Sequence, residues 1–135
     1  LGHKEKNSKV FIVGDSHAQT LIPVFDLLGK EKKISFKFAG TSGCPHLLGV
    51  QSERGASNIE KYNCKKLNRK IFNYIKNNNY QTIILFSRWG YYTPCYINCR
   101  TNRLSVTGET FNTADSFIFG LNKTIATYKK IGVNI

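Results

Sequence analysis

Short apolar runs separated by polar turns predict the strands of this chain. Residues 9–13 form a β-branched and aromatic run that ends at Gly14, which predicts a buried strand and then a tight turn. Residues 34–38 alternate apolar and polar side chains, which predicts a second strand leading into the glycine-rich segment 39–45. Residues 82–86 are continuously apolar, which is typical of a central parallel strand covered on both faces.

Helical spacing of apolar residues predicts a helix after each of these strands. In the first, Pro23 should bend or delay the opening turns and Gly29 should end the helix. The second is expected over 58–76, until Asn77 to Asn79 break it, and the third over 113–130. The apolar faces consist of Ala18, Leu21, Ile22, Phe25 and Leu28, then Leu67, Ile71, Tyr74 and Ile75, and finally Phe117, Leu121, Ile125 and Tyr128.

The order of these elements predicts the fold class. Strands and helices alternate, and residues 133–135 resemble the start of a further strand after an irregular stretch over 87–110. This order is typical of a three-layer α/β/α domain with a parallel, flavodoxin-like sheet. We expect a polar tail over 1–8 and one partial domain over 9–135, incomplete at its carboxyl end.

Composition and charge narrow the class of protein. The 135 residues, 41% of them hydrophobic, suffice for one core, and no apolar run approaches the roughly 18 residues that cross a bilayer. An export signal or membrane anchor is therefore expected upstream of Leu1. The net charge of +12 would suit nucleic acid, an anionic membrane or an acidic polymer. Because the lysines are scattered, a solvated basic surface is favoured over a nucleic-acid site.

Four cysteines allow three disulfide pairings. Cys95 and Cys99 flank a short turn-rich loop that a disulfide could close, which would leave Cys44 to pair with Cys64. Disulfides favour an oxidising compartment, and the alternative is four reduced thiols in a cytosolic protein. Neither the cysteine spacing nor any other pattern indicates a metal site, and no cofactor is expected.

The strongest chemical candidate is a serine at the end of the first strand. Ligands of open parallel sheets bind beyond the carboxyl ends of the strands, where the segments 14–17, 40–44 and 87–90 are expected. Ser16 would present its hydroxyl there, and its own N–H, near a helix amino end, would face a developing oxyanion. Without further context, Asp15-Ser16 is also an ordinary helix-capping pair.

Residues of the other two loops could complete such a site. Gly43, or less favourably Gly40, would bring a second N–H close to the oxyanion because glycine has no Cβ. Arg88 and Trp89 would lie on the same rim, where they could add a donor or hold an acyl or sugar group. Taken alone, Gly43 is as typical of a turn and Trp89 of a packed core.

These motifs resemble a known family. Residues 10–18 resemble the first block of the SGNH (GDSL-like) hydrolase superfamily. Asp15-Ser16-His17-Ala18, followed by the Ser42 to Pro45 loop, Cys64 and Arg88-Trp89, is similar in particular to the SGNH domain fused to acyltransferase-3 membrane proteins. Such proteins O-acylate bacterial surface polysaccharides, for example lipopolysaccharide O-antigen or peptidoglycan.

The resemblance implies roles for individual residues. Ser16 would be the nucleophile, Gly43 the second-block glycine of the oxyanion hole, and Asp15 a brace for the loop. The third-block Gly-x-Asn-Asp pattern is absent, and residues 87–90 stand in its place. His17 belongs to the first block and is not expected to face the Ser16 hydroxyl.

The family's general base comes from a late Asp-x-x-His block, which this sequence lacks. His3 lies in the polar tail, and His46 is expected to be a loop residue. Because a serine without a base is a poor nucleophile, we expect these 135 residues alone to be inactive or nearly so, and truncation to explain the missing block.

The resemblance therefore implies an O-acyltransferase, or O-acetyltransferase, domain on the periplasmic face of a bacterial inner membrane. Its partners would be an acyl donor, a cell-envelope glycan and a membrane acyltransferase domain upstream. Three alternatives remain: a carbohydrate O-acetyl esterase of the same fold, a non-catalytic glycan-binding domain and a basic nucleic-acid-binding domain.

Overall fold

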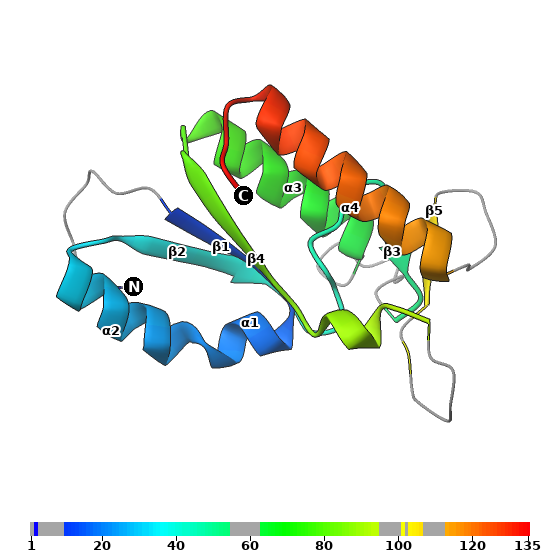
Figure 1. Ribbon diagram of the computed structural model, residues 1–135, viewed down its shortest axis with the longest axis horizontal. Coiled ribbons are helices and arrows are strands. Elements are labelled where there is room, and N and C mark those ends of the chain that lie inside the picture. The colour runs from blue at the N-terminus through cyan, green and yellow to red at the C-terminus, as the bar shows by residue number, and fades with distance from the viewer. Residues whose placement is uncertain (1, 3–9, 55–62, 95–100, 102, 107–112) are drawn as a thin grey trace.

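A parallel sheet forms the centre of the computed structural model, which describes residues 2, 10–54, 63–94, 101, 103–106 and 113–135 (Figure 1). Its strands β1 (Val10–Gly14), β2 (Phe36–Gly40) and β4 (Thr82–Phe86) lie in the order β2-β1-β4. The predicted parallel α/β class is confirmed. Gly14 pairs with both Gly40 and Phe86, so all three strands end at the same edge of the sheet.

The prediction that residues 82–86 form the central, doubly covered strand is wrong. β1 occupies the centre, and Phe86 at the end of β4 is 37% exposed. A continuous apolar run cannot by itself distinguish a central strand from one covered less completely. Beyond β4, Asn134 forms a single parallel bridge with Thr82, in the segment expected to begin another strand.

Glycines let the strand ends approach closely at this edge. A Cβ at Gly14 would lie 1.6 Å from the carbonyl oxygen of Phe86, and one at Gly40 would lie 1.8 Å from that of Gly14. Neither position can hold a larger residue without moving the sheet. Gly40 therefore allows β2 to pack closely against β1. The turn that carries Ser16 begins at Gly14, where the backbone of β4 lies close to β1.

The first predicted helix is two helices, α1 (Ser16–Thr20) and α2 (Ile22–Lys32). Pro23 lies in the first turn of α2, where its missing N–H costs no hydrogen bond. Gly29 does not end the helix, contrary to the prediction. It lies buried within α2 because the backbones of Gly2 and Ile34 approach it there, and Lys33 in a left-handed conformation (φ 56°) caps the helix instead.

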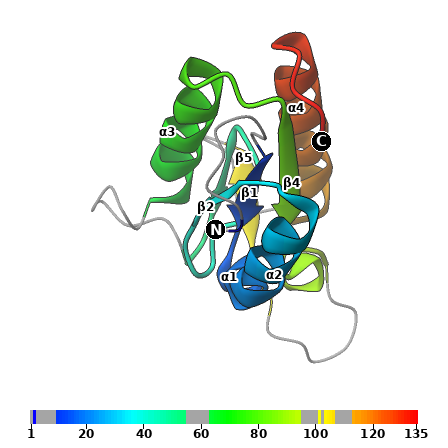
Figure 2. The same ribbon diagram turned by 90° about the vertical axis from the view of Figure 1, so that its left-hand side faces the viewer.

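Helices cover both faces of the sheet, which gives the three layers. Figures 1 and 2 show α1 and α2 on one side, and α3 (Cys64–Asn77) and α4 (Thr113–Lys130) on the other. Alternate β1 residues face the two layers: Phe11 and Val13 pack with α3 and α4, and Ile12 packs with Ala18 of α1. Residues 58–62 of the predicted second helix lie outside the described residues.

A small second sheet was not predicted. β3 (Val50–Ser52) pairs antiparallel with β5 (Leu104–Val106), and a one-turn 3₁₀ helix, η2 (Trp89–Tyr91), follows β4. Three-residue strands are too short to give a periodic signal. Their buried side chains pack with those of Leu47 and Tyr92, and with α4 residues that line this cluster.

A disulfide joins Cys44, in the loop after β2, to Cys64 at the start of α3. The other expected pair, Cys95–Cys99, lies outside the described residues.

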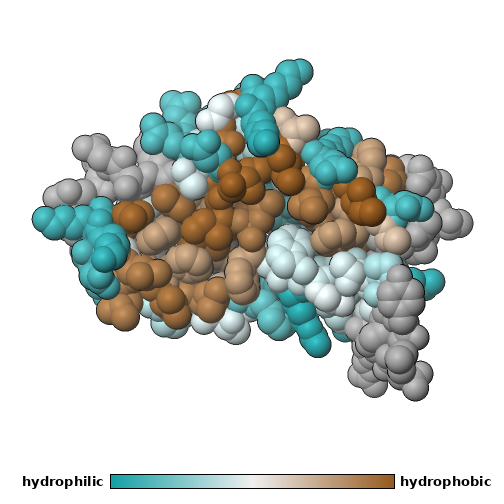
Figure 3. Space-filling view, viewed as in Figure 1, coloured by the Kyte–Doolittle hydropathy of each residue, from teal (hydrophilic) through white to brown (hydrophobic). Residues whose placement is uncertain are grey.

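In the part of the chain that the structure describes, no helix is both long and apolar enough to cross a bilayer. Exposed apolar side chains nevertheless gather over α2 and β4, where Leu27 is 67% exposed (Figure 3).

Candidate active site

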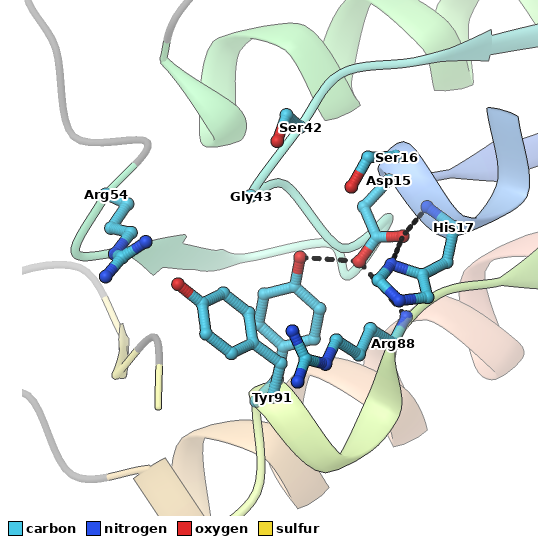
Figure 4. Close-up of a pocket in the computed structure, with 9 residues that line it drawn as sticks. Asp15, Ser16, His17, Ser42, Gly43, Arg54, Arg88 and Tyr91 are labelled. Carbon is cyan, nitrogen blue, oxygen red and sulfur yellow. Dashed lines mark hydrogen bonds and ion pairs between the residues drawn. The ribbon is translucent and has the colours of Figure 1, made fainter. Parts of the chain in front are cut away.

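Ser16 lies at the mouth of a pocket at the carboxyl edge of the sheet. It is the first residue of α1, directly after β1, and its hydroxyl faces a cavity of about 360 Å³ (Figure 4). Three strand-end loops contribute to this cavity, so the structure brings together residues that are far apart in sequence. The lining residues are Asp15, Ser16, His17, Ser42, Gly43, Arg54, Arg88, Tyr91 and Tyr92.

The carboxylate of Asp15 holds the turn that carries Ser16. Asp15 is 2% exposed, and its Oδ1 accepts the His17 N–H at 2.9 Å, which caps α1. Its Oδ2 accepts the Arg88 N–H at 3.1 Å and the Tyr92 O–H at 2.7 Å. These three bonds satisfy a buried charge and tie the turn after β1 to the segment after β4. Asp15 thus has the contacts of the brace that the sequence predicts.

Tyr92 is a partner that the sequence did not reveal. It is fully buried, and its burial together with the Asp15 carboxylate raises the pKa of its phenol well above the usual range. The phenol therefore stays protonated and acts as a donor to Asp15. The 77-residue separation between the two, across a stretch expected to be irregular, left no local signal that could have identified it.

His17 does not contact the hydroxyl of Ser16. Its side chain is 48% exposed, and Nδ1 lies 3.9 Å from Oδ1 of Asp15 (Figure 4). The ring lines the pocket on the Asp15 side. This orientation agrees with the expectation that a neighbour at a helix start does not point at the serine.

The loop of Gly43 is fixed from two directions. Gly43 has φ 73°, a left-handed conformation that glycine adopts without strain, and its carbonyl accepts the Ser52 O–H at 2.9 Å. The next residue, Cys44, is held to α3 by its disulfide. Backbone at Gly43 is thereby held at the pocket wall opposite Ser16, where Ser42 also lies (Figure 4).

Two arginines give the pocket a positive rim. The guanidinium carbons of Arg88 and Arg54 lie 5.2 and 5.4 Å from the ring centroid of Tyr91, within the range of cation–π contacts. Figure 4 shows Tyr91 between the two side chains. Arg88 was expected on this rim, whereas Arg54 and Tyr91 come from segments with no recognisable motif. The rim suits a ligand that carries or develops negative charge.

Trp89 is not among the residues that line the pocket, contrary to the prediction. Its ring packs edge-to-face against Phe117 of α4, with ring centroids 6.0 Å apart. The cause is the 3₁₀ turn after β4, in which successive side chains point in different directions. Arg88 and Tyr91 consequently line the pocket and Trp89 does not, although both Trp89 and Tyr91 pack against the cluster around Leu47.

His46 lies in the loop after β2, as expected, but its side chain is buried in the core. It is 1% exposed, with Nε2 2.7 Å from the Tyr128 hydroxyl and Nδ1 3.2 Å from Oδ1 of Asn68. The Asn68 amide nitrogen donates to the Pro45 carbonyl, so its oxygen is left to accept from Nδ1–H. Burial lowers the pKa of His46 to about 4, and the ring is neutral at pH 7. Its bonds place it away from Ser16, as a structural histidine.

Within the described residues, no three histidine, cysteine or carboxylate side chains are grouped so that they could hold a metal ion. The pocket brings the Ser16 hydroxyl together with the backbone of Gly43 and the side chains of two arginines. Such a set suits chemistry at a carbonyl carbon, where a serine attacks and a developing oxyanion must be stabilised.

Comparison with protein families identifies one family model that matches the chain. The family model described as "SGNH domain (fused to AT3 domains)" matches residues 1–135. Neither the curated proteins nor the solved structures contain a match to the chain.

Proposed function

Because the chain belongs to the family of SGNH domains fused to AT3 domains, which supports a hydrolase or acyltransferase role, we propose that it is an O-acyltransferase domain acting on a bacterial cell-envelope polysaccharide. The observation that carries the proposal is the position of Ser16. Its hydroxyl faces a pocket with a cationic rim, on a turn braced by the buried Asp15.

The proposed reaction has two acyl transfers. Oγ of Ser16 attacks the carbonyl carbon of the acyl donor, its proton passes to a general base, and the donor's leaving group departs with a proton when the tetrahedral adduct collapses. A sugar hydroxyl then attacks the resulting serine ester, and the serine hydroxyl re-forms. The acyl group, most simply acetyl, is thereby moved from donor to glycan with no net oxidation or reduction.

The oxyanion of each adduct would be stabilised by backbone and side-chain donors. The N–H of Ser16, at the amino end of α1, and the N–H of Gly43 are the proposed backbone donors. Arg88 would add positive charge from the rim. A donor of this kind is worth roughly a hundredfold or more in rate.

The general base is proposed to come from outside residues 1–135. Among the described residues, His17 turns its Nδ1 toward Asp15 and His46 is bonded to Asn68 and Tyr128. Asp15 is already engaged by three donors. We therefore expect the 135-residue chain to transfer acyl groups poorly by itself, because neither histidine in the described part of the chain is bonded to Ser16, and a serine without a base is a poor nucleophile.

The proposed location is the extracytoplasmic side of a bacterial inner membrane. The Cys44–Cys64 disulfide supports an oxidising compartment, and the family's fusion to AT3 domains supports membrane association. The acceptor would be a surface glycan, and the acyl donor would reach Ser16 through the membrane acyltransferase domain.

The test is acetyl transfer by the protein in its full natural length, with isotopically labelled acetyl donor and purified cell-envelope polysaccharide. We expect label on the glycan, and at least about a thousandfold less with Ser16→Ala. Label released only as free acetate would support an esterase instead. Undiminished transfer by the Ser16→Ala variant would contradict the proposal and leave a glycan-binding role.

A further inference from the structure

A second cavity, of about 480 Å³, lies between α3 and α4. Its floor is the segment that leads into β3, and it shares no lining residue with the Ser16 pocket. We call it the α3–α4 groove. The lining residues are Leu48, Gly49, Gln51, Asn63, Lys65, Lys66, Arg69, Phe72, Lys123 and Thr127.

The rim of the α3–α4 groove is strongly cationic. Of the ten lining residues that the structure describes, four are lysine or arginine and none is acidic. Lys65, Lys66 and Arg69 come from α3, where the last two are one helical turn apart, and Lys123 faces them from α4. Like charges around one cavity repel each other, so the positions of Lys66, Arg69 and Lys123 favour a bound anion between them.

The backbone gives Lys123 its position over the groove floor. Gly49 has φ +83°, and a Cβ there would lie 2.8 Å from Cδ of Lys123 and 2.9 Å from its Nζ. The missing side chain at Gly49 is thus what leaves room for the lysine. The Leu48 N–H donates to Oγ1 of Thr124 at 2.7 Å, which holds this segment against α4. The ammonium also lies 5.1 Å from the ring centroid of Phe119.

The floor of the groove is apolar. Leu48 is buried, and the half-buried ring of Phe72 packs edge-to-face with Tyr128 at 5.3 Å between centroids. An apolar floor beneath charged rim groups fits a ligand with C–H-rich faces and negative substituents. Acidic sugars have this combination, since their rings present C–H groups and their carboxylates or phosphates project from the ring edge.

We propose that the α3–α4 groove binds a segment of acidic polysaccharide, through carboxylate or phosphate groups that contact Lys66, Arg69 and Lys123. Its concave shape favours a chain-like ligand over the flat surface of a bilayer. Among the described residues of the lining, Phe72 is the single aromatic one, which disfavours a nucleic acid, whose bases stack on several rings. The site goes beyond the proposed acyl transfer. If that function holds, the groove would retain the acceptor glycan on the same domain.

Binding is measured by titration calorimetry with an oligogalacturonate, and with a neutral malto-oligosaccharide of the same length. The triple variant Lys66→Gln, Arg69→Gln, Lys123→Gln removes three charges from the groove. Its matched control, Lys76→Gln, Lys129→Gln, Lys130→Gln, removes three exposed charges from the same two helices outside the groove. Thermal melts check that both variants are folded.

We expect the acidic oligosaccharide to bind, more weakly as salt is raised, and the neutral one not to bind. The groove variant should bind about tenfold more weakly, and the control should match the wild type. Ser16→Ala should bind like the wild type, so a failure of the proposed catalysis would leave this result intact.

Three outcomes would overturn the proposal. Equal weakening in both triple variants would show that overall charge, and not the groove, attracts the ligand. Equal affinity for the neutral oligosaccharide would remove the role of the cations. Tighter binding to phosphatidylglycerol vesicles or to single-stranded DNA than to the oligogalacturonate would assign the groove to another ligand.

Discussion

Two buried polar clusters can be compared in the described part of this domain: one lies at the Ser16 pocket, and the other lies in the core. Asp15 accepts hydrogen bonds from His17, Arg88 and Tyr92 beside Ser16. His46 bonds to Asn68 and Tyr128 between the sheet and the α3–α4 layer. Both clusters join segments that are distant in sequence.

The two clusters differ in how they satisfy burial. Three donors converge on the Asp15 carboxylate, as a buried negative charge requires, whereas the His46 ring stays neutral with one donor and one acceptor. The comparison teaches that burial and hydrogen bonding do not by themselves identify a functional group. What distinguishes the Asp15 cluster is that it holds the turn of Ser16, the proposed nucleophile, at a cavity.

The largest effect is expected from Asp15→Asn. The amide supplies one acceptor oxygen where three donors converge, so an N–H would face a donor, and the free energy of unfolding should fall by about 3 kcal/mol. Reaction at Ser16 should slow as well, because the turn loses its brace. Urea unfolding measures the change in stability. The rate at which a fluorophosphonate labels Ser16 measures the change in reactivity. Glu31→Gln, at an exposed ion pair with Lys32, is the control expected to change neither; unchanged labelling in Asp15→Asn would remove the bracing role.

The second effect is a pH dependence caused by His46. Because the folded pKa of about 4 lies below the ordinary value of 6.5, the unfolded chain binds more protons between these two values. The free energy of unfolding therefore has its full value above pH 6.5. It falls by about 3 kcal/mol as the pH is lowered toward 4.

Unfolding free energies measured across this pH range test the effect of His46. The variant His46→Gln should have a flatter profile than the wild type. Identical slopes in the two proteins would mean that His46 is not buried as a neutral ring.

The smallest predicted effect, that of removing one tyrosine hydroxyl, distinguishes the Asp15 cluster from the His46 cluster. Tyr92→Phe removes a bond to Asp15, and Tyr128→Phe removes a bond to His46. Each should lower the free energy of unfolding by about 1 kcal/mol. Only Tyr92→Phe should slow labelling of Ser16, since only Tyr92 acts on its turn. Equal slowing in the two variants would show that labelling follows general stability.

The sequence allowed prediction of those parts of the fold that repeat a local pattern. The strands β1, β2 and β4 were each predicted to within two residues, because their apolar runs are bounded by glycine or polar turns. The buried Gly29 was mistaken for a helix end, since nothing in its neighbourhood shows that Gly2 packs on it. The three-residue strands β3 and β5 depend on contacts between distant segments.

Some residues of the candidate site could likewise be predicted from the sequence, and others could not. Ser16, Gly43 and Arg88 follow strand ends, so their meeting at one edge could be expected from a parallel sheet. Tyr92 and Arg54 reach the pocket from loops without a motif. Asn68 offered one overlooked signal, because it falls at helical spacing between the buried Cys64 and Ile71. A polar residue on the apolar face of a helix indicates a buried hydrogen-bond partner.

The central claim is that Ser16 is the nucleophile, and site-resolved labelling tests it most directly. The full-length protein is treated with a fluorophosphonate, which loses fluoride as it bonds to an activated serine oxygen, and the modified peptide is identified by mass spectrometry. Ser42 lines the same pocket and provides a matched control. The account predicts an adduct on Ser16 that persists in Ser42→Ala and disappears in Ser16→Ala. An adduct that survives in Ser16→Ala, or one on Ser42, would contradict it.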